Sequence, residues 1–308
     1  MELLNEENFV AEMYDKALPF LNGVRRTETV EGIYTEHYIR EDAKADLFIM
    51  HGYSEALYKY YELIYYMYNQ SFNVHAIEAR GHGRSIKTTR GRNNKVHIMD
   101  FNLYVEDLKR LIDGVEKERP KYLLGHSMGG CITLRLLEKY PDIDIDKVVL
   151  SSPMMRLNTK GIPERTSLLI ARHMCNRGKE EHFVFGQRAW LEINDTFEKA
   201  ATSSQGRYEY FRKMRLYNPV FQKSGSSYGW MREALQNEIL ARQESDRITK
   251  PLLVLQGEDD AYVDTSYFRK LKCRDVEIVP TSNTRHEVLN STNDVLLPIL
   301  NRVLEYLQ

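Results

Sequence analysis

Ser127 lies at the centre of Gly125-His-Ser-Met-Gly129, a spacing typical of a serine that acts as a nucleophile. The apolar run before it predicts a strand, and the periodic apolar residues after it predict a helix. A tight turn between the two would strain the serine backbone and lift its hydroxyl above the sheet. The flanking glycines suit such a turn, because strand and helix meet there too closely for a Cβ atom. The amide of Met128 would stand at the helix start, where anionic oxygen is favoured.

An inert serine in a glycine-rich turn would show the same pattern, so a nucleophile needs a base and an acid elsewhere in the chain. After a nucleophile of this kind, the partners follow in the order acid, then histidine. His286 is the only histidine after residue 182, and it lies seven positions beyond Val279. This is the loop expected between the last strand and the last helix. The order selects His286 as the base, with an ordinary surface histidine as the alternative interpretation.

The acid is expected at the end of the preceding strand, where four carboxylates lie close together: Glu258, Asp259, Asp260 and Asp264. A solvated acidic turn accounts for at least two of them. Spacing alone does not choose between Asp259 and Asp260. Whichever carboxylate binds imidazole Nδ1 would fix the tautomer and stabilise the imidazolium.

An oxyanion hole needs a second amide that faces the one at Met128. His51-Gly-Tyr53 closes an earlier predicted strand, so the backbone N–H of Tyr53 is the predicted donor. His82 and His126 are interpreted as structural residues that form hydrogen bonds in turns. No His, Cys or carboxylate set has zinc-site spacing, and the glycine loops of nucleotide-binding proteins are absent. We therefore expect no metal and no other cofactor.

The composition excludes several classes of protein. The chain has 308 residues and a formal net charge of −1, which provides no basic field for nucleic acid. Its three cysteines, Cys131, Cys175 and Cys273, are far apart, which favours a reducing compartment over a disulfide framework. The N-terminus lacks the pattern of a signal peptide, and no stretch approaches the ~18 apolar residues of a membrane span. We expect a soluble cytoplasmic protein, and the sequence leaves peripheral membrane contact and oligomeric state open.

One stretch is locally basic. It contains Arg80, Arg84, Lys87, Arg90, Arg92 and Lys95. The simple interpretation is a solvated loop, and the sharper one is a contact with lipid phosphate or an anionic membrane surface.

Short apolar runs alternate with helical patterns after an opening of about thirty mixed polar residues. The expected strands are 45–50, 72–79, 121–126, 147–151, 251–256 and 276–279, with two shorter ones around Gly32. The clearest helical patterns are 58–69, 100–118 and a terminal helix from about residue 293. This alternation predicts a mostly parallel twisted sheet with helices on both faces.

The alternation stops between about residues 154 and 247. No strand run of comparable quality occurs there, and helical patterns rich in Arg and aromatic residues replace it. We predict that 154–247 is a helical cap inserted into a core formed by 1–153 and 248–308.

Five motifs occur in a fixed order along the chain. They are His51-Gly-Tyr-Ser-Glu55, Arg80-Gly-His-Gly-Arg-Ser85, Gly125-His-Ser-Met-Gly-Gly130, the turn from Gly257 to Asp260 with Val263-Asp264, and His286-Glu-Val-Leu289. Together they resemble the monoacylglycerol lipase and lysophospholipase branch of the α/β-hydrolases, from about residue 25 to the C-terminus. In the cap, 202–208 and 228–235 look like bacterial lysophospholipases rather than monoacylglycerol lipases. Glu78 stands where the family usually has Asp, a position that we interpret as structural.

The resemblance implies an α/β-hydrolase fold with Ser127 as nucleophile, Asp260 as acid and His286 as base. It also implies an oxyanion hole formed by the amides of Tyr53 and Met128. The implied reaction is two-step hydrolysis of a monoacyl lipid ester, with lysophospholipid preferred over monoacylglycerol. Alternatives on the same fold are a short-chain carboxylesterase, a thioesterase, a proline-releasing aminopeptidase and a non-catalytic ligand-binding protein. A dehalogenase is disfavoured, because it would need Asp at position 127.

The cap would supply an apolar wall for one acyl chain, although caps also need aromatic residues merely to pack. The candidates for this wall are Phe183, Phe185, Trp190, Phe197, Phe211, Phe221, Tyr228 and Trp230.

Overall fold

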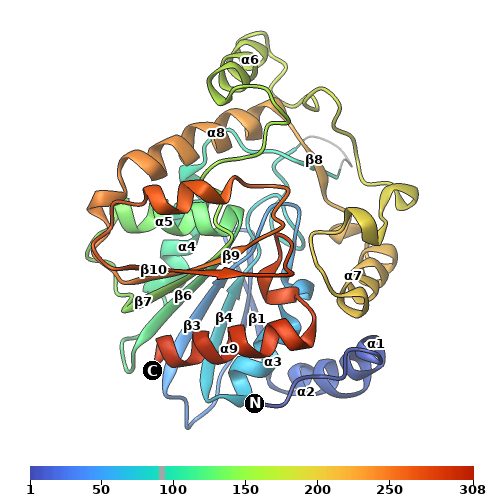
Figure 1. Cartoon of the computed structure of the whole chain (residues 1–308), viewed down its shortest axis with the longest axis vertical. Coiled ribbons are helices and arrows are strands. Elements are labelled where there is room, and N and C mark those ends of the chain that lie inside the picture. Colours follow the sequence, from blue (N-terminus) through green and yellow to red (C-terminus); the bar gives the residue numbers. More distant parts are fainter. Residues whose placement is uncertain (90–93) are drawn as a thin grey trace.

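An eight-stranded sheet runs through the middle of the computed structural model, which describes residues 1–89 and 94–308 (Figure 1). In spatial order its strands are β1 (Arg25–Val30), β2 (Ile33–Tyr38), β4 (Phe72–Ile77), β3 (Ala45–Met50), β6 (Lys121–His126), β7 (Lys147–Ser151), β9 (Leu252–Gly257) and β10 (Val276–Thr281). Strand β2 pairs antiparallel with β1 and β4, and every other pair in this sheet is parallel. The predicted mostly parallel sheet is therefore confirmed.

Helices cover both faces of the sheet, as predicted. One face carries α3 (Tyr61–Asn69) and α9 (Asn293–Leu307). The other carries α4 (Asn102–Asp113), α5 (Met128–Lys139) and α8 (Tyr228–Gln243). Strand β3 shows why the parallel strands have continuous apolar sequences: its alternate side chains are buried on opposite faces of the sheet. Its Leu47 and Ile49 enter the first core, and its Phe48 and Met50 enter the second.

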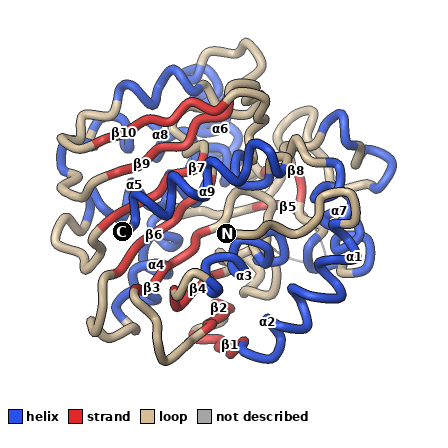
Figure 2. Tube along the Cα trace, turned by 60° about the horizontal axis from the view of Figure 1, so that its bottom comes forward, coloured by secondary structure: helices blue, strands red, loops and turns tan. Residues whose placement is uncertain are grey.

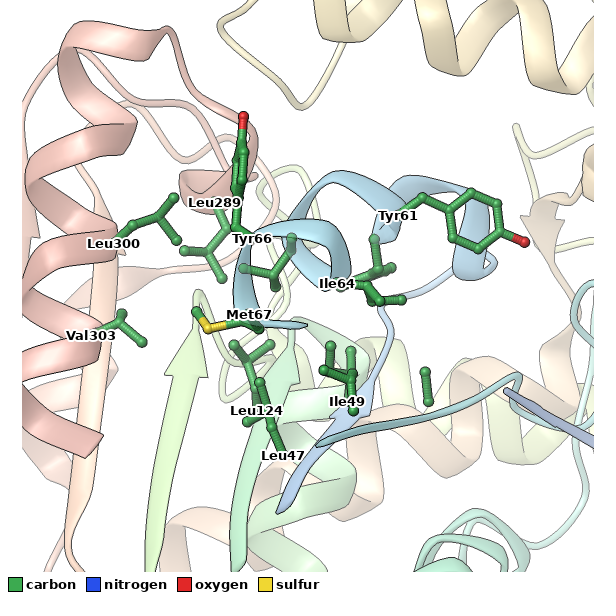
Figure 3. Close-up of a cluster of buried hydrophobic side chains, with 14 of the residues drawn as sticks. Leu47, Ile49, Tyr61, Ile64, Tyr66, Met67, Leu124, Leu289, Leu300 and Val303 are labelled. Carbon is green, nitrogen blue, oxygen red and sulfur yellow. The ribbon is translucent and has the colours of Figure 1, made fainter. Parts of the chain in front are cut away.

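The first core is packed between α3, α9 and the strands. In Figure 3, Met67 of α3 lies above Leu47 and Leu124 of the sheet, with Leu300 of α9 beside it. All four side chains are fully buried. Burial of a side chain of this size stabilises the fold by ~1.5–3 kcal/mol, so these contacts hold α3 and α9 firmly on the sheet.

The predicted insertion lies between β7 and β9 in the chain and is mainly helical. It contains α6 (Glu164–Asn176), α7 (Gln205–Tyr217), α8, the 3₁₀ turns η3 (Glu192–Asn194), η4 (Phe197–Lys199), η5 (Pro219–Phe221) and η6 (Ser245–Arg247), and the short strand β8 (Ser224–Ser226). Strand β8 pairs with β5 (Lys95–Val96), a contact that the Gly-Ser sequence of 224–229 did not predict. Helix α8 belongs to the insertion but packs on α5 of the core, so the two parts share an interface. The boundaries of the insertion at 154 and 247 stay a prediction.

The mixed polar N-terminus is also helical. It forms α1 (Phe9–Glu12), a π-helical turn η1 (Met13–Ala17) and α2 (Leu18–Val24). Both views of the backbone place α1 beside α7 (Figures 1 and 2), where the rings of Phe9 and Tyr210 are 6.0 Å apart. The buried guanidinium of Arg207 in α7 donates to both carboxylate oxygens of Glu62 and to the side chain of Asn293. The N-terminal half of α7 is therefore built into the core.

In the described ranges, none of the helices combines the length and the apolar character needed to cross a membrane.

Candidate active site

Ser127 occupies the turn between β6 and α5 with φ 51° and ψ −114°. This left-handed conformation is uncommon for a residue with a side chain, and the surrounding hydrogen bonds hold it. The amide of Ser127 donates to the carbonyl of Ser151 at 2.9 Å, and its carbonyl accepts from the amides of Cys131 and Met154. The predicted strand, tight turn and helix are all present.

The glycines of the motif are required by close backbone contacts. A Cβ at Gly129 would lie 2.2 Å from the carbonyl oxygen of Met50, and one at Gly125 would lie 2.7 Å from the carbonyl oxygen of Gly129. Neither contact can be relieved by a side-chain rotation, because the neighbouring atoms belong to the backbone. Residues at the flanks of the serine must therefore lack a Cβ, as the spacing predicts.

Ser127, His286 and Asp260 lie in one hydrogen-bonded line. The Oγ of Ser127 is 2.8 Å from Nε2 of His286, and Nδ1 of His286 is 2.7 Å from Oδ2 of Asp260. The other carboxylate oxygen of Asp260 accepts the amides of Tyr262 and Val263 at 2.8 and 3.0 Å. Burial would raise the pKa of Asp260, but the His286 contact and these amides more than offset it and lower the pKa. An ionised Asp260 holds the proton on Nδ1 and leaves Nε2 as the acceptor for the hydroxyl proton.

The structure also distinguishes among the four candidate carboxylates. Asp260 is the one bound to His286, and its side chain is only 1% exposed. Glu258 and Asp259 are exposed, and the Asp264 carboxylate accepts the amide of Ser266 at the start of a 3₁₀ turn. These three behave as the solvated acidic turn considered for the sequence.

The turn at His51 fixes the peptide before Tyr53. The amide of Ala79 donates to His51 Nε2 at 2.9 Å, so the imidazole proton is on Nδ1, which donates to the carbonyl of Gly52 at 2.7 Å. In a trans peptide the following N–H points away from that carbonyl, so the N–H of Tyr53 points away from His51. Met128 is the first residue of α5, and Ser127 and Tyr53 line the same cleft. The assignment of these two amides as the oxyanion hole stays a prediction.

A buried charged network beside the site was not found from the sequence. Lys59 pairs with both Glu55 and Glu287, and Glu55 also accepts the Tyr60 hydroxyl at 2.6 Å and the Gly52 amide at 2.8 Å. Burial opposes ionisation of Glu55, but the nearby positive charge of Lys59 outweighs it and lowers the pKa of Glu55 well below its usual range. The available signals were the position of Glu287 next to the predicted base and of Glu55 in the His-Gly turn.

Two further histidines are structural, as interpreted. His126 Nδ1 bonds to the carbonyl of Ser151, and His82 Nδ1 bonds to the carbonyl of Arg80. The ring of His126 also lies 5.0 Å from that of His286, so it forms part of the wall behind the base. Glu78 is fully buried and accepts the amide of Leu57 and the side chain of Arg84, which agrees with a structural role.

A cleft of about 1580 Å³ opens above Ser127 and His286. Five of the eight predicted wall residues line it: Phe185, Trp190, Phe211, Tyr228 and Trp230. The other three lie against cationic side chains instead, Phe183 against Lys95, Phe197 against Arg285 and Phe221 against Arg84. The prediction of an aromatic wall is thus correct for the first group and wrong for the second, where the rings serve packing.

The basic stretch is largely engaged inside the molecule. Arg80 forms two 2.7 Å hydrogen bonds with Asp107, and Arg84 pairs with Glu78 and Glu36. Neither interpretation of the stretch describes these two arginines, because the charge of each is paired with buried carboxylates. Arg90 and Arg92, which belong to the same prediction, lie outside the described residues.

Within residues 1–89 and 94–308, no three or more His, Cys, Asp or Glu side chains are grouped so as to hold a metal ion.

Comparison with known proteins identifies a family and relatives with hydrolase names. The model of the family described as serine aminopeptidase, S33, matches residues 41–293. A Haemophilus influenzae protein named probable lysophospholipase L2 is 30% identical over 274 residues, which cover 85% of this chain and 83% of that protein. The monoglyceride lipase of Mus musculus is 28% identical over 229 residues, covering 72% of this chain and 67% of its own.

A solved structure extends the likeness to three dimensions. It is a soluble variant of monoglyceride lipase from Saccharomyces cerevisiae in complex with a substrate analogue. The TM-score is 0.70 at 18% identity, and the match covers 92% of this chain and 94% of that one. At this identity the likeness concerns the fold alone.

Proposed function

The chain belongs to the serine aminopeptidase S33 family of α/β-hydrolases, and on that basis we propose that Ser127, His286 and Asp260 hydrolyse the ester of a monoacyl lipid. The predicted fold and family are confirmed, and relatives named lysophospholipase and monoglyceride lipase make the chain an ester hydrolase. The main support for this proposed catalytic triad is the pair of hydrogen bonds that joins the three side chains in the order serine, histidine, aspartate.

In the proposed reaction, His286 Nε2 takes the proton of Ser127 as Oγ attacks the ester carbonyl. Asp260 holds Nδ1–H and stabilises the imidazolium that forms. His286 then gives the proton to the departing alcohol, which leaves an acyl-enzyme. The same imidazole next takes a proton from water, and the resulting attack releases the fatty acid and restores the serine.

The amides of Tyr53 and Met128 are proposed to hold the oxyanion of both tetrahedral intermediates. Support comes from the helix start at Met128, where backbone N–H groups favour negative charge, and from the fixed peptide between Gly52 and Tyr53. Removing one such donor typically costs ~10²–10³ in turnover.

The apolar character of the cleft supports a lipid substrate. Four exposed apolar side chains line it: Ile162, Ile170, Phe185 and Leu191. Phe185 is 95% exposed, and exposing an apolar side chain to water is unfavourable. A small polar ester would not bury this ring, whereas an alkyl chain that enters from a micelle or bilayer would. The cleft, at about 1580 Å³, is larger than the ~300–1,000 Å³ of ordinary ligand sites, which suits a single long acyl chain with its head group.

The charges of the cleft favour lysophospholipid over monoacylglycerol. Three lining cations, Lys160, Arg188 and Lys199, form no ion pair with any other described residue. Two exposed carboxylates, Glu198 and Asp259, also line it. A head group with a phosphate and a cationic nitrogen would pair with both signs of charge, whereas uncharged glycerol would pair with neither.

The exposed apolar side chains also support peripheral membrane contact as part of the proposal. Phe185 and Ile193 are 95% and 85% exposed in the same inserted segment. We place the protein in the cytoplasm, supported by Cys131, Cys175 and Cys273, which are unpaired.

Labelling with a fluorophosphonate tests the nucleophile. The wild type should gain one phosphonyl group by intact mass, and Ser127→Ala should gain none. Labelling of the variant at the wild-type rate would remove Ser127 from the proposal.

A substrate panel separates the alternatives on this fold. It contains p-nitrophenyl esters from acetate to palmitate, lysophosphatidylcholine, monoacylglycerol, an acyl thioester and a proline arylamide. Turnover should peak on long monoacyl esters. Activity confined to acetate, the thioester or the arylamide would keep the triad and contradict the lipid assignment.

A further inference from the structure

The loop that carries His286 has little regular structure of its own. It runs from the end of β10 at Thr281 to the 3₁₀ turn η8 (Val288–Asn290). From the core, the amide of Asp259 donates to the carbonyl of Thr284 at 2.9 Å. Much of the remaining support comes from the inserted segment, through residues 197–202, which we call the clamp segment. It consists of η4 and the three residues that follow.

Arg285, immediately before the base, binds three carbonyls of the clamp segment. Its Nη1 donates to the carbonyl oxygens of Phe197 at 2.7 Å, Ala200 at 3.2 Å and Thr202 at 3.2 Å. Its guanidinium carbon lies 4.9 Å from the centre of the Phe197 ring. Arg285 forms no ion pair within the described ranges, so these carbonyls and this ring are the partners of its charge. A planar guanidinium suits such a site, because it can lie over an aromatic ring while one of its nitrogens donates to the carbonyls.

The other flank of the base is tied to the same segment. The amide of Glu287 donates to the carbonyl of Ala201 at 2.9 Å, and the Thr202 hydroxyl donates to the carbonyl of Asn290. The hydroxyl of Tyr262, whose ring lies 5.2 Å from that of His286, donates to the carbonyl of Lys199 at 3.1 Å. The clamp segment therefore contacts both sequence neighbours of His286 and one ring that packs on it.

The clamp segment is itself anchored and also lines the cleft. Directly after it, the buried Arg207 connects α7 to Glu62 and Asn293 of the core. Residues 198–202 belong to the wall of the cleft. One short segment thus joins the fixed part of the insertion, the surface that faces substrate and the loop of the base.

We propose that Arg285 is a positioning residue that holds His286 in line with Ser127 by binding the clamp segment, an inference that rests on the proposed triad. A displacement of ~1 Å at a reacting group costs ~10²-fold in rate. A lysine at position 285 keeps the charge, but its nitrogen lies one bond closer to the backbone than Nη1, and it lacks the planar group that lies over the Phe197 ring. Arg285 and residues 198–202 also line the cleft, so a p-nitrophenyl ester with a short acyl chain is the substrate on which the loss should fall on the chemical step.

Arg285→Lys and Arg285→Ala test the inference, with Arg242→Lys as the matched control. Arg242 also binds the inserted segment, through the carbonyl of Met155 and both oxygens of Glu164, and it has no bond to the loop of His286. On a p-nitrophenyl ester, Arg285→Lys should lower kcat ~10–100-fold with KM within ~2-fold of the wild type. Its rate of phosphonylation at Ser127 should fall in parallel, and Arg242→Lys should keep both rates.

Chemical rescue separates positioning from a general loss of structure. Millimolar methylguanidinium should raise kcat of Arg285→Ala at least several-fold and leave the wild type and Arg242→Lys unchanged. The inference is overturned if Arg285→Lys phosphonylates at the wild-type rate, if Arg242→Lys loses as much activity, or if no rescue occurs. Hydrolysis by Ser127→Ala at the wild-type rate would instead overturn the proposed triad, and the positioning role with it.

Discussion

Gly129→Ala is the perturbation that most directly links the backbone geometry to the chemistry. The new Cβ would lie 2.2 Å from the carbonyl oxygen of Met50 and 2.6 Å from that of His51. Ordinary contact begins at 3.4 Å, so the first turn of α5 and the end of β3 must separate by about 1.2 Å, the difference between 3.4 and 2.2 Å. The atoms in the way are backbone atoms, which cannot rotate aside.

This separation moves apart the two elements that carry the proposed oxyanion donors. The amide of Met128 starts α5, and the amide of Tyr53 follows β3 by three residues. A shift of about 1 Å takes a 2.9 Å hydrogen bond beyond useful range, which amounts to the loss of one donor. We expect kcat to fall ~10²–10³-fold with little change in KM. Overpacking should also lower the free energy of unfolding by ~1–3 kcal/mol.

Gly23→Ala is the matched control, because Gly23 lies in helix α2 with nothing within 4 Å of an added Cβ. There the substitution should raise the free energy of unfolding by ~0.5–1 kcal/mol and leave kcat unchanged. Urea unfolding and steady-state hydrolysis of a p-nitrophenyl ester measure both quantities. If Gly129→Ala lowers the free energy of unfolding as expected but keeps the wild-type kcat, displacing the two amides does not affect catalysis, and the assignment of the oxyanion hole is refuted.

Three other predictions test separate parts of the structure. Asp260→Asn should lower kcat ~10⁴-fold with a melting temperature close to that of the wild type, and a loss under tenfold would contradict its role as the acid. Arg207→Met leaves the buried Glu62 carboxylate unpaired and should reduce the free energy of unfolding by ~3–5 kcal/mol, a loss that Glu62→Leu should largely reverse in the double variant. Burial and the neighbouring His75 lower the pKa of His37 from 6.5 to about 4, so the unfolded chain binds more protons than the native state between these values. Stability should therefore fall by up to ~3 kcal/mol as the pH drops through this window, and urea unfolding of His37→Gln should show a shallower decline.

The features that were predictable from the sequence are those that depend on neighbouring residues. Strands buried on both faces appear as apolar runs, so β3 and β6 were expected at their observed positions. The turn at Ser127 needs glycine on both sides, and the chain order leaves one histidine for the base. The choice of Asp260 over Asp259 needed the family resemblance, because it depends on which carboxylate turns inward, and a one-residue shift in an acidic turn leaves no local pattern.

The features that were missed depend on contacts between distant parts of the chain. Lys59 and Glu287 are 228 positions apart, and each alone looks like a surface charge. Arg80 and Arg84 look like a basic loop until their partner carboxylates are placed by the fold. Arg285 binds backbone carbonyls, which every residue carries, so no side-chain pattern could have indicated its partners.

Ser127 is the proposed nucleophile in the hydrolysis of a monoacyl lipid ester. The most direct test is release of fatty acid from lysophosphatidylcholine by the wild type and Ser127→Ala, measured side by side with equal amounts of folded protein. We expect continuous release by the wild type and a rate at least ~10⁴-fold lower in the variant. Equal rates in the two proteins would contradict this role of Ser127.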